Sequence, residues 1–309
     1  MAETLLPLLP AHLARQLEQA LARRGRFACG RFAPSPTGAL HAGNLRTALW
    51  SWLAARSRAG AWLLRLDDLD TPRNRPGAEE AIVADLTWLG LHWDGPLWRQ
   101  SERLGLYGSV LSALRRGGHL YPCRCSRRLL ADISAPHGAP PLYPGTCRDL
   151  PPHWGVQAGR LPSWRLRLDE VGLGQVGDVV LRRADGFVAY HLATAVDELW
   201  LGIDQVVRGH DLFAATAPQV ALMGRLGAAP PAYLHVPLWR DQQGQRLAKR
   251  QGGLGLEHWR DQGLDAAAVV GVLAASAGWV PQGSRLSAAE LLQEASARFR
   301  DAPPQPAQP

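Results

Sequence analysis

The stretch that decides the fold of this chain is residues 31–44, RFAPSPTGALHAGN. It follows residues 26–33, whose apolar character predicts a buried strand. A helix with one apolar face comes next, marked by Leu45, Leu49, Trp52 and Leu53. Loops between a strand and a helix lie at the carboxyl edge of an α/β sheet, where such folds bind nucleotides. We therefore expect a nucleotide site at this loop.

The residue types in the loop suit a phosphate group. Pro34 and Pro36 stiffen the backbone, whereas Gly38 and Gly43 let a phosphate or adenine approach it. The following helix offers free N–H groups and its positive end to an anion. His41 can donate to a phosphate oxygen that gains charge in a transition state. Taken alone, a loop rich in proline and glycine favours an ordinary strand-to-helix connection, and only the complete string is more specific.

Strands and helices alternate beyond this unit. Residues 61–66, AWLLRL, predict a strand, and helices are predicted over residues 76–90 and 101–117. Ser101 is placed as the N-cap of the second helix. Its predicted apolar stripe is Leu104, Tyr107, Leu111 and Leu114. This alternation predicts a doubly wound, parallel, Rossmann-like α/β sheet.

The alternation then stops at a segment rich in Cys, Pro, Gly and Arg, which we interpret as an inserted module. Strands are predicted again over residues 179–182 and 187–191 around a turn at 184–186, and a helix over 214–226. Two more helices are predicted over residues 265–277 and 287–298. The predicted division begins with an N-terminal extension (1–25) that contains a short amphipathic helix. A nucleotide-binding domain follows in two halves (26–120 and 163–235), with the insertion (121–162) between them. A lysine loop with a short helical C-terminal part (236–300) and a disordered tail (301–309) complete the chain.

Composition limits the class of protein. The 309 residues carry a formal charge of +7, which suits nucleic acid or a nucleotide without proving either. Among 34 basic residues Lys249 is the single lysine, so a site that needs a compact point charge is the expected reason for it. No apolar run approaches the roughly 20 residues that span a bilayer. We expect a cytoplasmic protein with no membrane partner and with reduced cysteines.

Three of the four cysteines fall within the insertion, at Cys123, Cys125 and Cys147. Thiolates so clustered can bind tetrahedral zinc, although their spacing fits buried free thiols equally well. The residues leave a fourth ligand open among His119, His137 and Tyr143. Cys29, in the first strand, is interpreted as core packing.

Five motifs in order resemble the catalytic region of class I glutamyl-tRNA synthetases. RFAPSPTG with HAGN resembles the first signature of that family, its "HIGH" region. Residues 65–70, RLDDLD, are similar to the family's R-I-E-D-T-D, and residues 246–250, RLAKR, to its KMSKS loop. Residues 190–193 and 206–208 complete the match, which covers about residues 26 to 260. Only 59 residues follow Arg250, fewer than the anticodon-binding region of the longer enzymes needs.

The resemblance implies a role for each matched residue. It implies that His41 and Lys249 are catalytic. Residues for ATP would be His41, Gly43, Asn44, Arg246 and Lys249. Residues for glutamate would be Arg31, Phe32, Ala33, Pro34, Ser35, Asp67, Tyr190 and Arg208. Four positions depart from the family: Asp67 is one methylene shorter than its Glu, Asn44 fills the fourth place of the HIGH-like motif, and Arg246 and Ala248 replace a lysine and a serine of the loop.

The Cys-x-Cys and Tyr-x3-Cys spacing resembles the short glutamyl-queuosine tRNA(Asp) synthetases. This implies one zinc held by Cys123, Cys125, Tyr143 and Cys147. It further implies an enzyme that activates L-glutamate with ATP and magnesium and passes the glutamyl group to queuosine in the anticodon of tRNA(Asp). We expect a monomer. The alternatives are a conventional glutamyl-tRNA synthetase subunit lacking its anticodon domain and a noncatalytic paralogue that binds amino acid or tRNA. Lys249, His41 and Arg31, all present, argue against the noncatalytic one.

Overall fold

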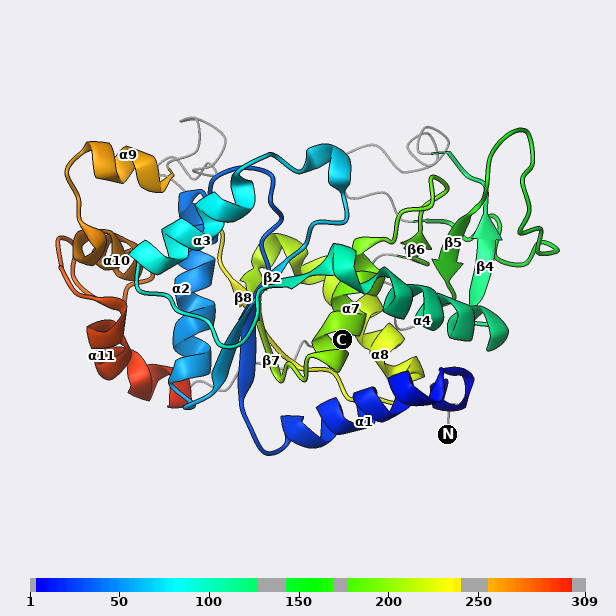
Figure 1. Cartoon of the computed structure of the whole chain (residues 1–309), viewed down its shortest axis with the longest axis horizontal. Coiled ribbons are helices and arrows are strands. Elements are labelled where there is room, and N and C mark those ends of the chain that lie inside the picture. Colours follow the sequence, from blue (N-terminus) through cyan, green and yellow to red (C-terminus); the bar gives the residue numbers. More distant parts are fainter. Residues whose placement is uncertain (1–3, 127–142, 169–176, 240–254, 302–309) are drawn as a thin grey trace.

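The computed structural model describes residues 4–126, 143–168, 177–239 and 255–301 of the chain (Figure 1). For residues 295–301 it describes the backbone alone. The predictions for His137, Arg246, Ala248, Lys249 and most of the C-terminal tail lie outside the described residues.

The first half of the fold is a parallel sheet with helices packed on it. Its strands are β1 (Cys29–Phe32), β2 (Ala61–Leu66) and β3 (Trp98–Arg99), in the order β1-β2-β3. Helix α2 (Ala42–Arg56) follows β1, and η2 (Thr71–Arg73) and α3 (Ala78–Trp88) lie between β2 and β3. The predicted strand-loop-helix unit is confirmed. Leu45, Leu49 and Leu53 on α2 are fully buried, because the helix carries them toward the sheet.

The second half supplies another pair of parallel strands. Strands β7 (Gln205–Gly209) and β8 (Ala232–Val236) pair in register, with η4 (His210–Ala215) and α8 (Thr216–Arg225) between them. Strand β7 lies beside β1, since the backbone N–H of Asp204 donates to the carbonyl of Cys29 at 3.0 Å. The predicted α/β class with parallel sheets is confirmed, and the first strands of the two halves meet at the centre of the molecule (Figure 1).

One predicted strand is wrong. Residues 187–191 form only a single bridge, from Val188 to Arg182, and helix α7 (Tyr190–Trp200) begins within them. The helix forms because Leu192, Val196 and Leu199 recur at helical spacing and are fully buried. The predicted turn before it is present, since the N–H of Gly186 donates to the carbonyl of Arg183.

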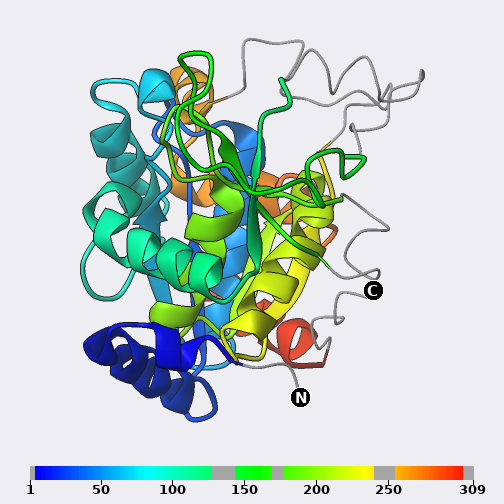
Figure 2. The same ribbon diagram turned by 90° about the vertical axis from the view of Figure 1, so that its right-hand side faces the viewer.

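A separate antiparallel sheet lies at one end of the molecule, on the right in Figure 1. It consists of β4 (Leu120–Cys123), β5 (Ser163–Leu166) and β6 (Val180–Arg182), with Cys123 opposite Ser163. This sheet crosses the predicted domain boundary between residues 162 and 163. Helix α4 (Leu104–Arg116) precedes it, and in Figure 2 α4 and α8 lie on either side of it.

The predicted N-cap at Ser101 is wrong. Ser101 lies in η3 (Gln100–Arg103), and its hydroxyl donates to the carboxylate of Asp68 at 2.6 Å. Helix α4 starts three residues later, and Leu104, predicted on its apolar stripe, is 53% exposed. Asp68, the hydrogen-bond partner of Ser101, lies 33 positions earlier in the sequence, so rules for helix capping, which consider only neighbouring residues, could not reveal it.

The terminal helices cover the two halves. Helix α1 (Ala11–Arg24), after η1 (Leu6–Leu8), buries Leu13 and Leu17, which confirms the predicted amphipathic helix. It packs on α7, below the sheet in Figure 1. Helices α9 (Leu256–Asp261), α10 (Ala266–Ala275) and α11 (Ala288–Asp301) add their apolar side chains to the core around α2. Within the described ranges, no helix has both the length and the apolarity needed to cross a membrane.

Candidate active site

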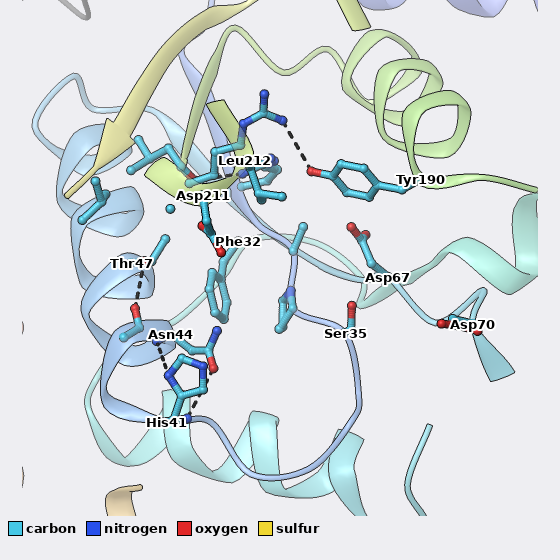
Figure 3. A pocket seen from close by; sticks show the side chains of 18 of the residues that line it. Phe32, Ser35, His41, Asn44, Thr47, Asp67, Asp70, Tyr190, Asp211 and Leu212 are labelled. Carbon is cyan, nitrogen blue, oxygen red and sulfur yellow. Dashed lines mark hydrogen bonds between the residues drawn. The ribbon is translucent and has the colours of Figure 1, made fainter. Parts of the chain in front are cut away.

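A cavity of about 590 Å³ opens where the parallel strands end (Figure 3). Most of its walls come from residues that end or follow β1, β2, β7 and β8, the edge at which α/β folds bind ligands, and the segment from Arg183 to Tyr190 adds another wall. All the predicted ligand-binding residues that the structure describes line it: Arg31, Phe32, Ala33, Pro34, Ser35, His41, Gly43, Asn44, Asp67, Tyr190 and Arg208. Residues 177 positions apart in sequence thus share one cavity.

The N-terminus of α2 forms one wall of the cavity. His41 is the N-cap, and its Nδ1 accepts a hydrogen bond from the backbone N–H of Asn44 at 3.3 Å. In return the Oδ1 of Asn44 accepts from the backbone N–H of His41. This reciprocal capping box explains the asparagine in the fourth place of the motif. A Cβ on Gly43 would lie 3.1 Å from the imidazole, so glycine leaves room for the ring.

The same contacts set the protonation of His41. Because Nδ1 accepts a hydrogen bond, the proton of the neutral ring sits on Nε2. Burial lowers the pKa of His41, and the nearby carboxylate of Asp211 only partly opposes this. The imidazole is therefore neutral at pH 7 and keeps one N–H, on Nε2, for donation to a ligand.

A buried network of ion pairs supports the opposite wall. Arg31 Nε donates to Glu198 Oε1 at 2.9 Å, and Arg65 Nη1 lies 3.6 Å from the same oxygen. The Nε of Arg65 also donates to the Oδ1 of Asp67 at 2.7 Å. Glu198 and Arg65 are wholly buried, whereas Asp67 keeps 11% of its side chain exposed. Burial alone would raise the pKa of Glu198, but the charges of Arg31 and Arg65 outweigh it and lower that pKa.

Asp197, the neighbour of Glu198 on α7, completes this network. Its carboxylate accepts from Arg103 at 2.7 Å, from Gln100 at 3.0 Å and from the hydroxyl of Tyr107 at 2.9 Å. Sequence reasoning missed both carboxylates. Two adjacent acidic residues within the mainly apolar sequence of α7 could have indicated a buried polar network. The sequence analysis did not predict this helix, so the pattern was not recognised.

Arg208 differs from the network because all its partners are neutral. Its Nη1 donates to Gln219 at 2.8 Å and to the hydroxyl of Tyr190 at 3.4 Å, and its Nη2 donates to Thr216 at 2.7 Å. Its Nε donates to His235, whose pKa is lowered to about 4 by burial and by the charge of Arg208. Among the described residues no carboxylate forms a salt bridge with this guanidinium, which is 3% exposed and lines the cavity.

Two described residues flank the segment that contains Arg246 and Lys249, and each has a link to this cavity. Trp239 lines it, with the guanidinium of Arg46 5.7 Å from its ring. Gly255 forms an isolated bridge with His41.

Comparisons with known proteins agree with this geometry. Residues 29–150 and 166–296 match the family model "tRNA synthetases class I (E and Q), catalytic domain". The chain belongs to the class I tRNA synthetases. A relative from Prochlorococcus marinus (strain MIT 9303), named glutamyl-Q tRNA(Asp) synthetase, is 61% identical over 93% of this chain and 94% of its own. A relative of the same name from Symbiobacterium thermophilum is 44% identical, and the match covers 85% of this chain and 91% of the relative.

Solved class I synthetases share the fold. The glutamate–tRNA synthetase of Elizabethkingia anophelis is 25% identical, with a TM-score of 0.72 over 87% of this chain and 65% of its own. A glutamate tRNA ligase from Elizabethkingia meningosepticum, solved in complex with its amino acid, is 26% identical with a TM-score of 0.70. The match covers 86% of this chain and 64% of the ligase. The chain thus spans about two thirds of the length of these solved synthetases.

Three thiols of this synthetase gather outside the cavity. The Sγ atoms of Cys123, Cys125 and Cys147 lie within 4.8 Å of one another. The Tyr143 hydroxyl lies 3.4 Å from Cys123 Sγ and accepts from the N–H of Cys147 at 2.9 Å. Sulfurs on a tetrahedral zinc lie roughly 3.8 Å apart, given Zn–S bonds of about 2.3 Å. The donor set fits that ion, and among the described residues no histidine or carboxylate joins it.

Proposed function

We propose that the protein activates L-glutamate with ATP and then transfers the glutamyl group to queuosine in the anticodon of tRNA(Asp). The observation that carries the first step is Arg208, a buried guanidinium at the cavity whose partners among the described residues are all neutral. An unpaired buried charge is costly, so such a group favours an anionic ligand. The names of the relatives, glutamyl-Q tRNA(Asp) synthetase, support the choice of amino acid and acceptor.

The hydrogen-bond donors suit a zwitterion with two carboxylates. A guanidinium has five N–H bonds. Arg31 uses two on Glu198 and on the carbonyl of Val207, which leaves three for a carboxylate. Arg208 keeps one, and the Tyr190 hydroxyl beside it accepts from Arg208 and can donate its own proton. We assign these groups to the carboxylates, with Phe32, Ala33, Pro34 and Ser35 as the adjoining wall.

The ammonium group is assigned to Asp67, whose carboxylate borders the cavity near Tyr190 in Figure 3. Arg65 contacts both oxygens of Asp67, so their orientation is constrained and their remaining lone pairs can accept from the ligand. The side chain is one methylene shorter than the glutamate typical of the family. A bridging water is expected to cover this difference at little energetic cost.

ATP is assigned to the wall formed by α2. The Nε2–H of His41, the backbone at Gly43, the amide of Asn44 and the positive end of the helix would contact its phosphates, joined by Arg246 and Lys249. Magnesium, which enters with the substrate, neutralises phosphate charge. An α-carboxylate oxygen of glutamate attacks the α-phosphorus, and pyrophosphate leaves. A hydroxyl of queuosine then attacks the activated carbonyl carbon, and AMP leaves. The protein contributes orientation and charge stabilisation, without a covalent intermediate on its own side chains.

The acceptor is tested by supplying labelled glutamate and ATP with tRNA(Asp) from cells that make queuosine and from cells that cannot. We expect label only in the queuosine-containing tRNA, and none in tRNA(Glu), because the modified base supplies the hydroxyl. Equal labelling of the two tRNA(Asp) preparations would contradict the acceptor and leave glutamate activation intact. Absence of glutamate-dependent ATP–pyrophosphate exchange would instead favour the noncatalytic alternative.

We also propose that one zinc ion is held by Cys123, Cys125, Tyr143 and Cys147, where it would tie β4 to the segment that returns through Cys147. Elemental analysis of the purified protein should find about one equivalent. Cys125→Ser should lose most of it, whereas Cys29→Ser, outside the cluster, should retain it. Full zinc retention in Cys125→Ser would contradict the site. Zinc loss should loosen the antiparallel sheet while the parallel strands stay folded.

A further inference from the structure

Two exposed aromatic rings stand beside the cavity, outside it. His210 and Phe213 lie on η4 with ring centroids 5.5 Å apart and an interplanar angle of 20°. Phe213 is 38% exposed, and His210 is exposed as well. Asp211 and Leu212, which lie between them in sequence, line the cavity (Figure 3), whereas the two rings do not. The pair therefore borders the cavity without forming part of its wall.

The pair is held from behind by a chain of rings. Phe213 contacts His235 edge-on, with ring centroids 5.1 Å apart. His235 stacks on Tyr233, with centroids 6.1 Å apart and an interplanar angle of 6°. Tyr233 in turn packs against the guanidinium of Arg208 at 4.9 Å. A ligand that protrudes from the cavity can cover the exposed face of Phe213, because the neighbouring residues Asp211 and Leu212 line that cavity. The supports of Phe213 keep its ring oriented before any ligand arrives.

We propose that His210 and Phe213 form a stacking platform for a nucleobase of the acceptor RNA. This inference rests on the proposed function, because the acceptor must reach the activated carbonyl from outside the cavity. Proteins read unpaired RNA bases largely by stacking them on aromatic side chains. The adenine of ATP is the other candidate for the same contact. The lining of the cavity, however, includes Asp211 and Leu212 and not these rings, so a nucleotide held wholly inside it would not contact them. A base of a bulky substrate that protrudes from the cavity meets the rings.

Phe213→Ala should raise the KM for tRNA roughly 5- to 100-fold, the range that loss of one base–aromatic stack produces. The KM values for glutamate and ATP in pyrophosphate exchange should change less than twofold. Phe213→Trp should restore the KM for tRNA, because it keeps an aromatic face, and Phe213→Leu should not. The matched control is Phe27→Ala, which removes a phenyl ring that is 69% exposed near the amino end of β1, away from the cavity.

The outcomes separate this platform from the proposed function. An unchanged KM for tRNA in Phe213→Ala, an equal rise in Phe27→Ala, or a rise in the KM for ATP alone would each overturn the platform. If the unaltered protein transfers no glutamate to queuosine-containing tRNA(Asp), the proposed function fails. The platform is then judged by direct binding of the same tRNA, which should weaken in Phe213→Ala and return in Phe213→Trp. Equal binding by the unaltered and Phe213→Ala proteins would overturn it.

Discussion

Lys249→Ala is expected to slow glutamate-dependent ATP–pyrophosphate exchange by about a hundredfold or more, the usual cost of removing one preorganised charge donor from a transition state. Lys249 is the single lysine of the chain. Of the described residues that flank its segment, Trp239 lines the cavity and Gly255 forms a bridge with His41, which also lines it. The fall should appear in kcat, because charge on the leaving pyrophosphate develops during the reaction. Steady-state exchange at varied ATP and glutamate measures it.

Two variants sharpen this test. Lys249→Arg should also be slow, because a planar guanidinium does not replace a compact ammonium group. Arg208→Gln should instead raise mainly the KM for glutamate, since Arg208 is assigned to ground-state binding of a carboxylate. Near-normal exchange by Lys249→Ala would show that the loop around it was misassigned. The thermal unfolding midpoints of the three variants, compared with that of the unaltered protein, exclude misfolding as the cause.

Glu198→Ala should lower the free energy of unfolding by about 3–5 kcal/mol, because it leaves the buried guanidinium groups of Arg31 and Arg65 without their shared carboxylate. Urea unfolding followed by circular dichroism measures the loss. Glu102→Ala is the matched control, since that carboxylate is 61% exposed and pairs with Arg99 on the surface. It should change the free energy of unfolding by about 1 kcal/mol or less. Similar losses in the two variants would contradict the importance of the buried network.

The pH dependence of stability provides a second measurement on Glu198. Its pKa in the folded protein is lowered from the usual value of 4.5. A lowered folded-state pKa means that the stabilisation is present above 4.5 and is lost as the pH falls below it. Between pH 7 and pH 3 the unaltered protein should therefore lose more stability than Glu198→Gln, which has no carboxyl group to protonate. Parallel stability curves would contradict this role.

The local structure around motifs contiguous in sequence was predicted well, because it depends on neighbouring residues. The loop over residues 31–44 specifies its own strand, turn and helix start, so Arg31, His41 and Gly43 could be singled out without a structure. The strand at residues 61–66 was predicted with its observed bounds. In contrast, Asn44 was assigned to ATP binding and noted as a departure from the motif, but its capping role was not predicted. Its reciprocal hydrogen bonds with His41 became visible once the helix end was in place.

The amino-acid sequence by itself determined the α/β class, the family and the residues expected to meet substrate, because hydrophobic periodicity and short motifs act over a few neighbouring positions. Tertiary structure alone decided which charges are compensated. Arg31 pairs with Glu198, 167 positions away, whereas Arg208 contacts only neutral groups within the described part of the chain. It also placed His210 and Phe213 beside the cavity. Such contacts depend on how helices and strands pack in space, and no pattern along the chain encodes the distance between residues so far apart.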